Sequence, residues 1–342
     1  MGGMETYSKA LSDALQTHLE VETIVLPGHT DGSVPRASEI LRFGFRAACN
    51  ILFMRQAPTV THVADMASWP LAFCARIRNR GGRQVLSAHG TDVSYPLRGG
   101  VKGRLYGAYL RLGARLLGPV TVVANSAATA EATKSYGFST VDVVPLAAEV
   151  TANDVVTPRS SLLFCGRLIK LKGLSWFVDE VLPLLPETVT LDVAGTLWDE
   201  AEAAVLHDTR VNYLGRLDQD KLWQACAEAL CVVVPNIDVP SGAFEGFGLV
   251  ALEASAAGGL VLASRQAGLK DAVIDGETGF LLPPGYAGAW AEKIRDVLSW
   301  NETRRTTFTQ NAKDVCARHF TWERVAADTV SAYGIATNEK AA

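Results

Sequence analysis

Two glutamates, Glu245 and Glu253, give the strongest chemical signal in the sequence. They bracket the run Glu245-Gly-Phe-Gly-Leu-Val-Ala-Leu-Glu253, in which two glycines precede an apolar helical stretch. A carboxylate accepts hydrogen bonds from hydroxyl groups, so the pair suits a sugar and a ribose. The free N–H groups of Phe247, Gly248 and Leu249, at the helix start, would point at negative charge. An ordinary acidic first turn would explain Glu245, but not a second glutamate inside an apolar run.

A second signal is the cationic segment Gly166-Arg167-Leu-Ile-Lys170-Leu-Lys172-Gly173, which follows a strand pattern and leads into a helix pattern. Two or three cations beside a helix N-terminus can bind a pyrophosphate without a metal ion. Alone this pattern is weak, because charged loops after strands are common, but together with the two glutamates it indicates a nucleotide-sugar site. The spacing departs from a Walker loop and no G-x-G-x-x-G follows a strand, which argues against P-loop NTPases and nicotinamide-dependent dehydrogenases.

Short β-branched runs alternate with helical patterns in the first half of the chain, which predicts a parallel sheet covered on both faces. The predicted strands are Val21–Leu26, Val60–Ala64, Gln84–Ala88, Val120–Ala124 and Val141–Val144. The predicted helices are Met4–His18, Ser38–Met54, Trp69–Asn79, Lys102–Leu117 and Ala127–Tyr136.

The alternation restarts after a polar, proline-bounded stretch, and this predicts a second domain of the same kind. Its predicted strands are Ser161–Cys165, Val189–Val193, Val211–Leu214, Cys231–Val234 and Leu260–Ala263. Its predicted helices are Leu174–Leu185, Asp199–Leu206, Gln219–Ala229, Leu249–Ala257 and Ala287–Trp300, with a last helix at Trp322–Ala336. The expected organisation is an N-terminal domain over 1–146, a linker over 147–159, a C-terminal domain over 160–320, and a helix and tail over 321–342. A ligand cleft is expected between the domains.

One feature departs from a Rossmann-like domain, which normally opens with a buried strand. Here Met1 is followed at once by Gly2-Gly3, the loop that should come after such a strand. We therefore expect the first strand of the N-terminal domain to be absent, or its place to be filled by another segment. A missing central strand would leave unpaired backbone and cost several kcal/mol, roughly.

Composition indicates a folded chain of 342 residues, 48% of them hydrophobic, with a formal net charge of -4. Charge is uneven: thirteen basic residues and three acidic ones lie between Arg36 and Arg115. Such a stretch is either a set of solvated helix faces or a surface for an anionic membrane or acceptor. The six cysteines form no C-x-x-C pair, and no metal site is predicted. No signal peptide or membrane span is visible, so we expect a cytoplasmic protein that can reach the inner face of the plasma membrane.

These motifs resemble the retaining glycosyltransferases of family 4, which have the GT-B fold of two Rossmann-like doubly wound domains facing a cleft. The resemblance covers nearly the whole chain and is most specific in the second domain. It implies that Arg167 and Lys172 bind the donor diphosphate next to Gly166, and that Glu253 binds the ribose. It further implies that Glu245 and the amides of Phe247, Gly248 and Leu249 hold the transferred sugar. Three further residues would lie along the nucleotide: Gly195, Leu214 and Arg216.

In the first domain, Gly2 and Gly3 resemble the family's glycine loop, which touches donor phosphate and acceptor. Ser87-Ala-His89-Gly90-Thr91-Asp92 resembles its histidine loop, which implies that His89 lies near the donor sugar. A lone histidine at a strand end is more often structural, but the adjacent residues favour the site. Asn125-Ser126 also matches a family position, where we expect helix capping. The family's Pro-Asn-Gly-Val-Asp and Gly-Gly-x-x-Glu are replaced by Pro145-Leu-Ala-Ala-Glu149 and Gly268-Leu-Lys270-Asp271, and 237–243 are extra.

The resemblance implies a metal-independent hexosyl transfer with retention of anomeric configuration, from a UDP- or GDP-linked sugar to a glycan or lipid-linked acceptor. His89, Glu245, Arg167 and Lys172 are the expected catalytic residues, no cofactor is needed, and cell-surface polysaccharide or glycolipid synthesis is the expected role. Three alternatives stay open: a GT-B epimerase or phosphorylase, although no cofactor lysine for a phosphorylase is evident; a nucleotide-sugar-binding protein without turnover; and a DNA-modifying glucosyltransferase. A DNA-modifying enzyme would need aromatic residues interleaved with its cations, and the basic stretch lacks them, so no nucleic acid partner is expected.

Overall fold

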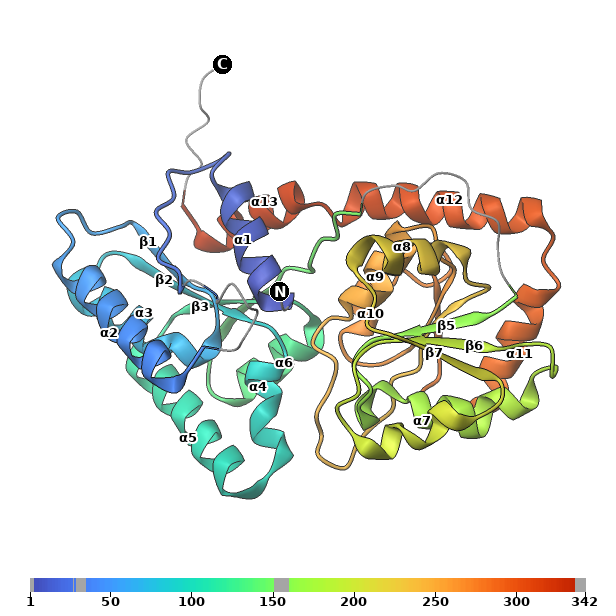
Figure 1. Cartoon of the computed structure of the whole chain (residues 1–342). Coiled ribbons are helices and arrows are strands. Elements are labelled where there is room, and N and C mark those ends of the chain that lie inside the picture. The colour runs from blue at the N-terminus through green and yellow to red at the C-terminus, as the bar shows by residue number, and fades with distance from the viewer. Residues whose placement is uncertain (1–2, 27, 29–34, 151–159, 336–342) are drawn as a thin grey trace, which may run out of the picture. The chain divides into compact units, whose positions relative to one another are not determined.

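The computed structural model describes residues 3–26, 28, 35–150 and 160–335, so most of the expected linker and Gly2 lie outside the described residues. The chain forms two compact units (Figure 1). Unit 1 combines the chain up to Pro145 with the C-terminal segment from Trp322, and unit 2 is Leu146–Thr321. The last helix therefore belongs to the N-terminal unit. Its Arg324 donates a hydrogen bond to the carbonyl of Pro145, which ties the two ends of unit 1 together.

Unit 1 is built on a parallel sheet in the order β1-β2-β3-β4. The strands are β1 (Val60–Val63), β2 (Arg83–Ala88), β3 (Thr121–Ala124) and β4 (Thr140–Val143). Three helices form a layer on one side of this sheet: α2 (Ala37–Phe53), α3 (Trp69–Arg78) and α5 (Gly100–Leu117) (Figure 1). Helix α1 (Gly3–Leu15) packs with α13 (Trp322–Tyr333) on the other side. The shorter α4 (Thr91–Ser94) and α6 (Ala127–Ser135) complete the unit.

The predicted strand at Val21–Leu26 is wrong. These residues have no regular structure, and Ile24 and Val25 are 39% and 69% exposed. A strand needs a neighbouring strand for its N–H and C=O groups, and none of the described residues pairs with this segment. Among the described residues, β1 has a sheet partner on one side only.

Unit 2 contains a six-stranded parallel sheet in the order β10-β9-β8-β5-β6-β7. Its strands are β5 (Leu162–Cys165), β6 (Leu191–Ala194), β7 (Val211–Gly215), β8 (Val232–Val234), β9 (Val261–Ser264) and β10 (Phe280–Leu282). The strand order runs outward from β5 in both directions, first through β6 and β7, then through β8 to β10. In such sheets, ligands bind outside the carboxyl ends of the strands where the order reverses. The topology therefore directs attention to the loops that follow β5 and β8.

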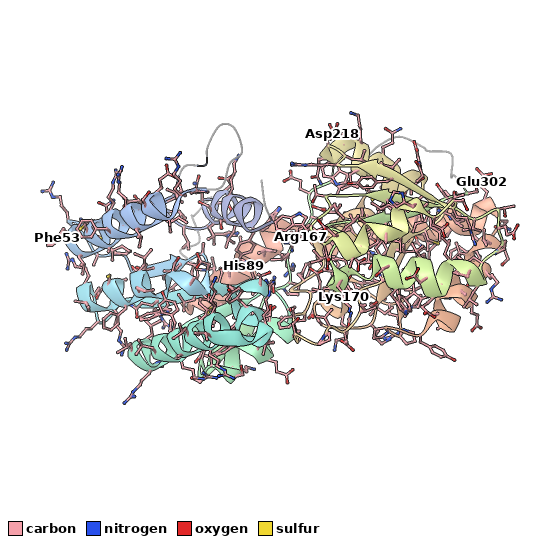
Figure 2. The ribbon with its side chains drawn as sticks, turned by 60° about the horizontal axis from the view of Figure 1, so that its bottom comes forward. Phe53, His89, Arg167, Lys170, Asp218 and Glu302 are labelled. Carbon is pink, nitrogen blue, oxygen red and sulfur yellow. The ribbon has the colours of Figure 1, made fainter. Side chains whose placement is uncertain are left out.

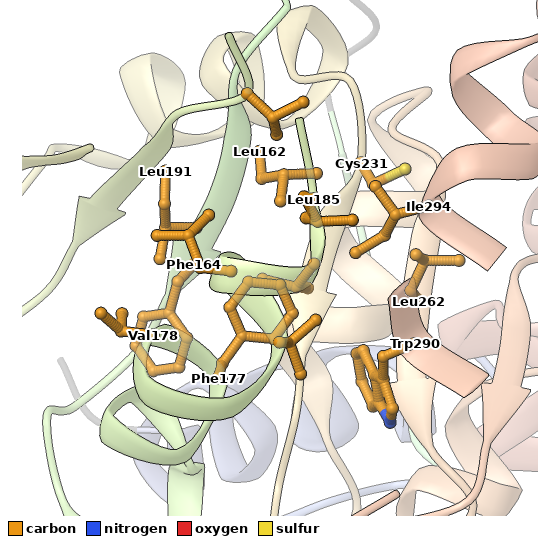
Figure 3. Close-up of a cluster of buried hydrophobic side chains, with 14 of the residues drawn as sticks. Leu162, Phe164, Phe177, Val178, Leu185, Leu191, Cys231, Leu262, Trp290 and Ile294 are labelled. Atoms are coloured by element: carbon orange, nitrogen blue, oxygen red, sulfur yellow. The ribbon is translucent and has the colours of Figure 1, made fainter. Parts of the chain in front are cut away.

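The sheet of unit 2 is held by a large apolar cluster on one of its faces (Figure 3). Phe164 and Leu191 project from the strands, and Phe177 and Trp290 come from the helices that cover them. All four side chains are at most 1% exposed, and burial of each contributes about 1.5–3 kcal/mol. This packing gives the loops at the strand ends a rigid base.

Several elements of unit 2 differ from the prediction. The helix expected at Leu174–Leu185 begins as α7 (Leu174–Trp176) and continues as wider and then tighter turns to Leu184, and the one expected at Asp199–Leu206 is two 3-10 turns. Helices α8 (Gln219–Glu228), α9 (Leu249–Ala256) and α11 (Ala287–Leu298) lie where expected. Three elements were not predicted: β10, the short α10 (Leu269–Ala272) and the long α12 (Glu302–His319). Helix α12 has a mostly polar sequence with few buried residues, so its amphipathic pattern is weak.

Candidate functional site

The loop after β5 carries the predicted cations, and Arg167 and Lys170 mark it in Figure 2. Arg167 is exposed, and Lys170–Lys172 form a 3-10 turn that ends at Gly173 with a φ of 71°. A Cβ atom at Gly173 would overlap the carbonyl oxygen of Pro235, just beyond β8. Only glycine allows this left-handed conformation and this close approach. The turn therefore lies against the exit of β8 and brings Lys172 to the residues that follow it.

Lys172 forms an ion pair with Glu245, and the two side chains are only 12% and 18% exposed. The Asn236 side-chain amide donates a second hydrogen bond, of 3.1 Å, to the same carboxylate oxygen. Burial alone would raise the pKa of Glu245, but Lys172, Asn236 and Arg167 together lower it below its usual range. The site therefore holds an ionised carboxylate that can accept hydrogen bonds from sugar hydroxyls.

The N-terminus of α9 lies directly after this carboxylate. Its N-cap residue is Gly248, at a φ of 100°, where a Cβ atom would run into the side chain of Leu269. In the described part of the chain, no group accepts a hydrogen bond from the amides of Phe247, Gly248 and Leu249. Because such amides carry partial positive charge, they favour an anion at this position.

Glu253 lies inside α9, between Leu252 and Ala254, which are fully buried. No described residue forms a hydrogen bond or an ion pair with its carboxyl group. Burial raises the pKa of Glu253 to about 7. The unpartnered carboxylate that the sequence suggested is thus partly protonated at neutral pH, and its oxygens are free for a ligand.

The loops after β6 and β7 lie next to the cationic loop. A Cβ atom at Gly195 would overlap the carbonyl oxygen of Gly166, so these two predicted glycines are in direct contact. Gly195 also donates a 2.8 Å hydrogen bond to the carbonyl of Gly215. Leu214 and Arg216 flank Gly215 and are exposed. The predicted residues of β5, β6 and β7 are thus neighbours along one sheet edge, although Leu214 and Arg216 form no hydrogen bond or ion pair with Lys172 or Glu245 among the described interactions.

Two residues of this edge were missed by the sequence analysis. Asn236 follows β8 and is fully buried. Only its hydrogen bond to Glu245 shows that it orients this carboxylate. Trp198 follows β6, is 68% exposed, and its ring centroid lies 5.4 Å from the Arg167 guanidinium carbon. Its indole N–H donates to the Thr196 hydroxyl at 3.0 Å, which fixes the ring next to Arg167. An aromatic residue after a predicted strand was the available signal for Trp198.

In unit 1, His89 follows β2 in a tightly bonded loop (Figure 2). Its Nε2 atom lies 2.8 Å from the carbonyl oxygen of Ala64. A carbonyl only accepts, so Nε2 carries a proton, and in the neutral form of the ring Nδ1 is an acceptor. The His89 amide donates to Asp92, whose pKa is raised by burial, and Asn125 donates to the His89 carbonyl. These bonds fix the orientation of the imidazole.

A buried chain of hydrogen bonds behind His89 was not predicted. His62 on β1 bonds to the Tyr333 hydroxyl through Nδ1 at 2.7 Å and to the Ser87 hydroxyl through Nε2 at 2.8 Å. Ser87 in turn bonds to the Tyr7 hydroxyl at 3.3 Å, and the Tyr7 ring packs edge-on against His89. Burial, and next the charge of His89, lower the pKa of His62 to about 4. The chain therefore links α13, β1, β2 and α1 through a neutral imidazole.

The remaining predicted residues are placed as follows. Gly3 begins α1. Ser126 caps α6 by accepting a hydrogen bond from the Thr129 amide, as expected. His89 and Gly3 belong to unit 1, and the other predicted site residues that the structure describes belong to unit 2. Within the described ranges, no group of three or more His, Cys, Asp or Glu side chains is arranged to hold a metal ion, and none of the helices is long and apolar enough to cross a membrane.

Comparison with known families matches both halves of the chain. Residues 1–150 match the model of Glycosyltransferase Family 4, and residues 159–299 match that of Glycosyl transferases group 1. A D-inositol 3-phosphate glycosyltransferase of Arthrobacter sp. (strain FB24) is 29% identical over 65% of this chain and 57% of its own length. A glycogen synthase of Mycobacterium tuberculosis is 34% identical over 52% of this chain and 43% of its own length. The chain thus spans about half the length of these curated relatives.

Solved structures share the fold over nearly the full length of both chains. Anabaena HepE in complex with UDP and glucose has a TM-score of 0.70 at 18% identity, covering 98% of this chain and 96% of that one. Sucrose-phosphate synthase from Thermosynechococcus elongatus has a TM-score of 0.70 at 21% identity, covering 97% and 93%. These structures confirm the expected α/β fold with two parallel-sheet domains.

Proposed function

Because this chain belongs to the group 1 glycosyltransferases of family 4, we propose that it transfers a hexose from a nucleotide-sugar donor to an acceptor hydroxyl. The observation that carries the proposal is the cluster of Lys172, Glu245 and the free amides of α9, where the strand order of unit 2 reverses. In this cluster, the cation and the helix amides can bind a diphosphate, and the ionised carboxylate can accept hydrogen bonds from sugar hydroxyls. HepE was solved with UDP and with UDP-glucose, which supports a UDP- or GDP-linked donor here.

The proposed chemistry is transfer with retention by attack on the same face of the sugar. The bond from the anomeric carbon to the diphosphate oxygen breaks, and the bond to the acceptor oxygen forms. The acceptor proton passes to the departing phosphate oxygen. Negative charge grows on that diphosphate, where Arg167, Lys172 and the amides of α9 would stabilise it. A double displacement would require a carboxylate nucleophile under the anomeric carbon, whereas Glu245 is already engaged by Lys172 and Asn236.

The remaining proposed roles are those that the resemblance to the family implies. Glu253 would accept hydrogen bonds from the ribose hydroxyls, and Gly195, Leu214 and Arg216 would line the nucleotide. In unit 1, His89 would accept a hydrogen bond from a sugar hydroxyl through Nδ1, and the glycine loop would approach the donor. Since Arg167 and Lys172 would supply the positive charge for the leaving group, we expect activity in EDTA.

We propose a glycan or a lipid-linked acceptor, in the synthesis of cell-surface polysaccharide or glycolipid at the inner face of the plasma membrane. The excess of basic residues between Arg36 and Arg115 supports an anionic acceptor or surface.

A thermal-shift titration with UDP, GDP, ADP and dTDP in EDTA, each with and without its common sugar, tests the donor site. We expect one nucleotide to stabilise the chain, and the effect to be lost in Glu253→Ala. Stabilisation by none of them would contradict the proposal. The two alternatives give other results in a turnover assay: a binding protein would bind nucleotide without turnover, and an epimerase would convert the donor without any acceptor.

A further inference from the structure

Tyr7 lies on α1 and packs against His89 from the interior of unit 1. The centroids of the two rings are 4.7 Å apart, and the ring planes meet at 73°. Tyr7 is only 4% exposed, whereas His89 is half-buried. A ligand can therefore reach His89 but not Tyr7, so any effect of Tyr7 on a ligand must pass through the groups that it contacts.

The contact with Tyr7 adds packing to the hydrogen bonds of His89. Asp92 and Asn125 bond to the backbone of His89, and the bond from Nε2 to the Ala64 carbonyl is the hydrogen bond of the ring. A side chain is held more firmly when packing locks the rotamer that a hydrogen bond selects. This matters for a group in a reaction, because a misplacement of about 1 Å can cost about 10²-fold in rate.

Tyr7 is itself held by the C-terminal helix. Helix α13 packs along α1 (Figure 1), and the Trp322 ring at its start lies 6.0 Å from the Tyr7 ring, centroid to centroid. Tyr333 at its end closes the hydrogen-bond chain that runs through His62 and Ser87 to the Tyr7 hydroxyl. Trp322 and Tyr333 are the first and last of twelve helical residues, about three turns apart, so they lie on the same side of α13. That side of the helix therefore restrains Tyr7 by two routes.

Stability alone does not account for a polar chain at this place. Ser87 and Tyr333 are 1% and 3% exposed, and a buried hydroxyl or imidazole costs free energy unless it is hydrogen-bonded. Apolar side chains of the same shape can fill such a space with nearly equal or greater stability. A polar network in which each group has a partner, by contrast, fixes one arrangement of the core. Here that arrangement ends at the ring that packs against His89.

We propose that Tyr7 is a positioning residue for His89, and that the chain of Ser87, His62 and Tyr333 holds Tyr7 in place. The inference rests on the proposed function, because it is His89 that would meet the donor sugar. Turnover and the state of the His89 ring can be measured separately, so a failure of the inference is distinguishable from a failure of the proposed function.

Steady-state kinetics of Tyr7 variants give the first test. Tyr7→Leu removes both the ring and the hydroxyl, and should lower kcat/KM about tenfold or more. Tyr7→Phe keeps the ring and should recover most of this loss. The matched control is Phe138→Leu, which removes another buried ring of unit 1 that has no described ring contact with His89. It should retain the kcat/KM of the parent even though its melting temperature falls.

A double-mutant cycle shows whether Tyr7 acts through His89. In the His89→Ala background, Tyr7→Leu should change kcat/KM by no more than about twofold. An equal loss in both backgrounds would mean that Tyr7 acts on the fold as a whole, and would overturn the proposal, as would parental kcat/KM in Tyr7→Leu. Parental kcat/KM in His89→Ala is a different result, because it would remove His89 from the proposed function and leave Tyr7 nothing to position.

Nitrogen-15 NMR of the histidine rings in the full chain reports on His89 without turnover. At about pH 8, where a free imidazole is neutral, the parent should show His89 as the Nε2–H tautomer that its bond to Ala64 requires. The signals are assigned by their loss in His89→Ala. In Tyr7→Leu the two nitrogen shifts of His89 should move towards each other, because a loosened ring exchanges between tautomers.

Tyr333→Phe removes the far end of the chain but keeps the volume of the core, so it tests the same point even where Tyr7→Leu does not fold. It should move the His89 shifts in the same direction by a smaller amount. Unchanged His89 signals in both variants would overturn the proposal, whatever the turnover.

Discussion

Glu245 and Glu253 lie in one short segment, yet their surroundings give them opposite chemistry. Glu245, in the loop before α9, is paired with Lys172 and bonded to Asn236, and its pKa is lowered. Glu253, inside α9, has no partner among the described residues, and burial raises its pKa to about 7. The difference indicates two tasks. The first carboxylate is held ionised and oriented without any ligand, and we propose that the second gains its partner only when a ligand binds.

The same contrast occurs between two histidines of unit 1. Among the described residues, one ring nitrogen of His89 has a hydrogen-bond partner and the other has none, whereas both nitrogens of His62 are bonded in the buried chain between Tyr333 and Ser87. We infer that His62, with both nitrogens bonded, serves the fold, and that His89, with one, serves a ligand. The predictions below test this distinction.

The largest effect is expected from the cations that act on the paired carboxylate and the leaving group. Arg167→Ala and Lys172→Ala should each reduce kcat about 10²- to 10³-fold, because each removes a preorganised charge from the leaving diphosphate. Lys172→Ala should also raise the pKa of Glu245. The matched control is Lys170→Ala, an exposed cation of the same turn, which should retain most activity. Near-normal turnover of both variants in steady-state assays would remove Arg167 and Lys172 from the mechanism.

Acid stability should reveal His62 as a structural group. Its pKa is about 4 in the folded chain against an ordinary value of 6.5. Because the buried imidazole must be neutral, the unfolded chain takes up the proton first as the pH falls. The free energy of unfolding is therefore highest above pH 6.5 and falls towards pH 4, by up to about 3 kcal/mol. In His62→Gln, the free energy of unfolding from denaturant titrations should fall less over this range. An identical pH dependence in parent and variant would mean that His62 does not titrate as described.

The contribution of Glu253 to stability should depend on pH with the opposite sign to that of His62. Its pKa of about 7 in the folded chain lies above the ordinary value of 4.5 for a glutamate, so the ligand-free chain gains stability from this group as the pH falls from 7 to 4.5. Ribose hydroxyls that donate to the carboxylate favour its charged form, so nucleotide binding near pH 7 should release a proton. The affinity for the nucleotide should therefore rise with pH. The total rise should be about tenfold for each unit by which binding lowers the pKa of Glu253.

Calorimetry of UDP binding in buffers of different ionisation enthalpy measures this proton. Glu253→Gln is the control, since any proton that it still releases comes from the nucleotide phosphate itself. Equal proton release in parent and variant would exclude Glu253 from the ribose site.

The smallest effect is expected at Trp198, whose ring restrains the Arg167 guanidinium at the edge of the site. Trp198→Ala should lower kcat several-fold, in line with about 0.5–1 kcal/mol for an exposed cation–π contact. Because the ring is exposed, melting temperature should change little, and Trp198→Phe should restore part of the loss. A fall in stability equal to the fall in activity would point to a merely structural role.

Much of the fold could be predicted because its signals are local. Nine of the ten strands in the described residues lie where short apolar runs indicated them. As the sequence indicated, the cations follow β5, Glu245 lies in the loop after β8, and Glu253 lies inside α9. The errors have physical causes. Val21–Leu26 has a strand composition but no described strand to pair with, and α12 buries too few residues to show a helical period.

Sequence by itself determined, to within about one residue, where five of the six described strands of unit 2 end, because side-chain periodicity is set by neighbours in the chain. Only the tertiary structure decided which of these residues meet. Lys172 and Glu245 are 73 positions apart, and Tyr333 and His62 are 271 apart. Their contacts depend on strand order and on the close approach at Gly173, and pKa values depend on burial and on charges brought near by folding. Local periodicity carries no record of either.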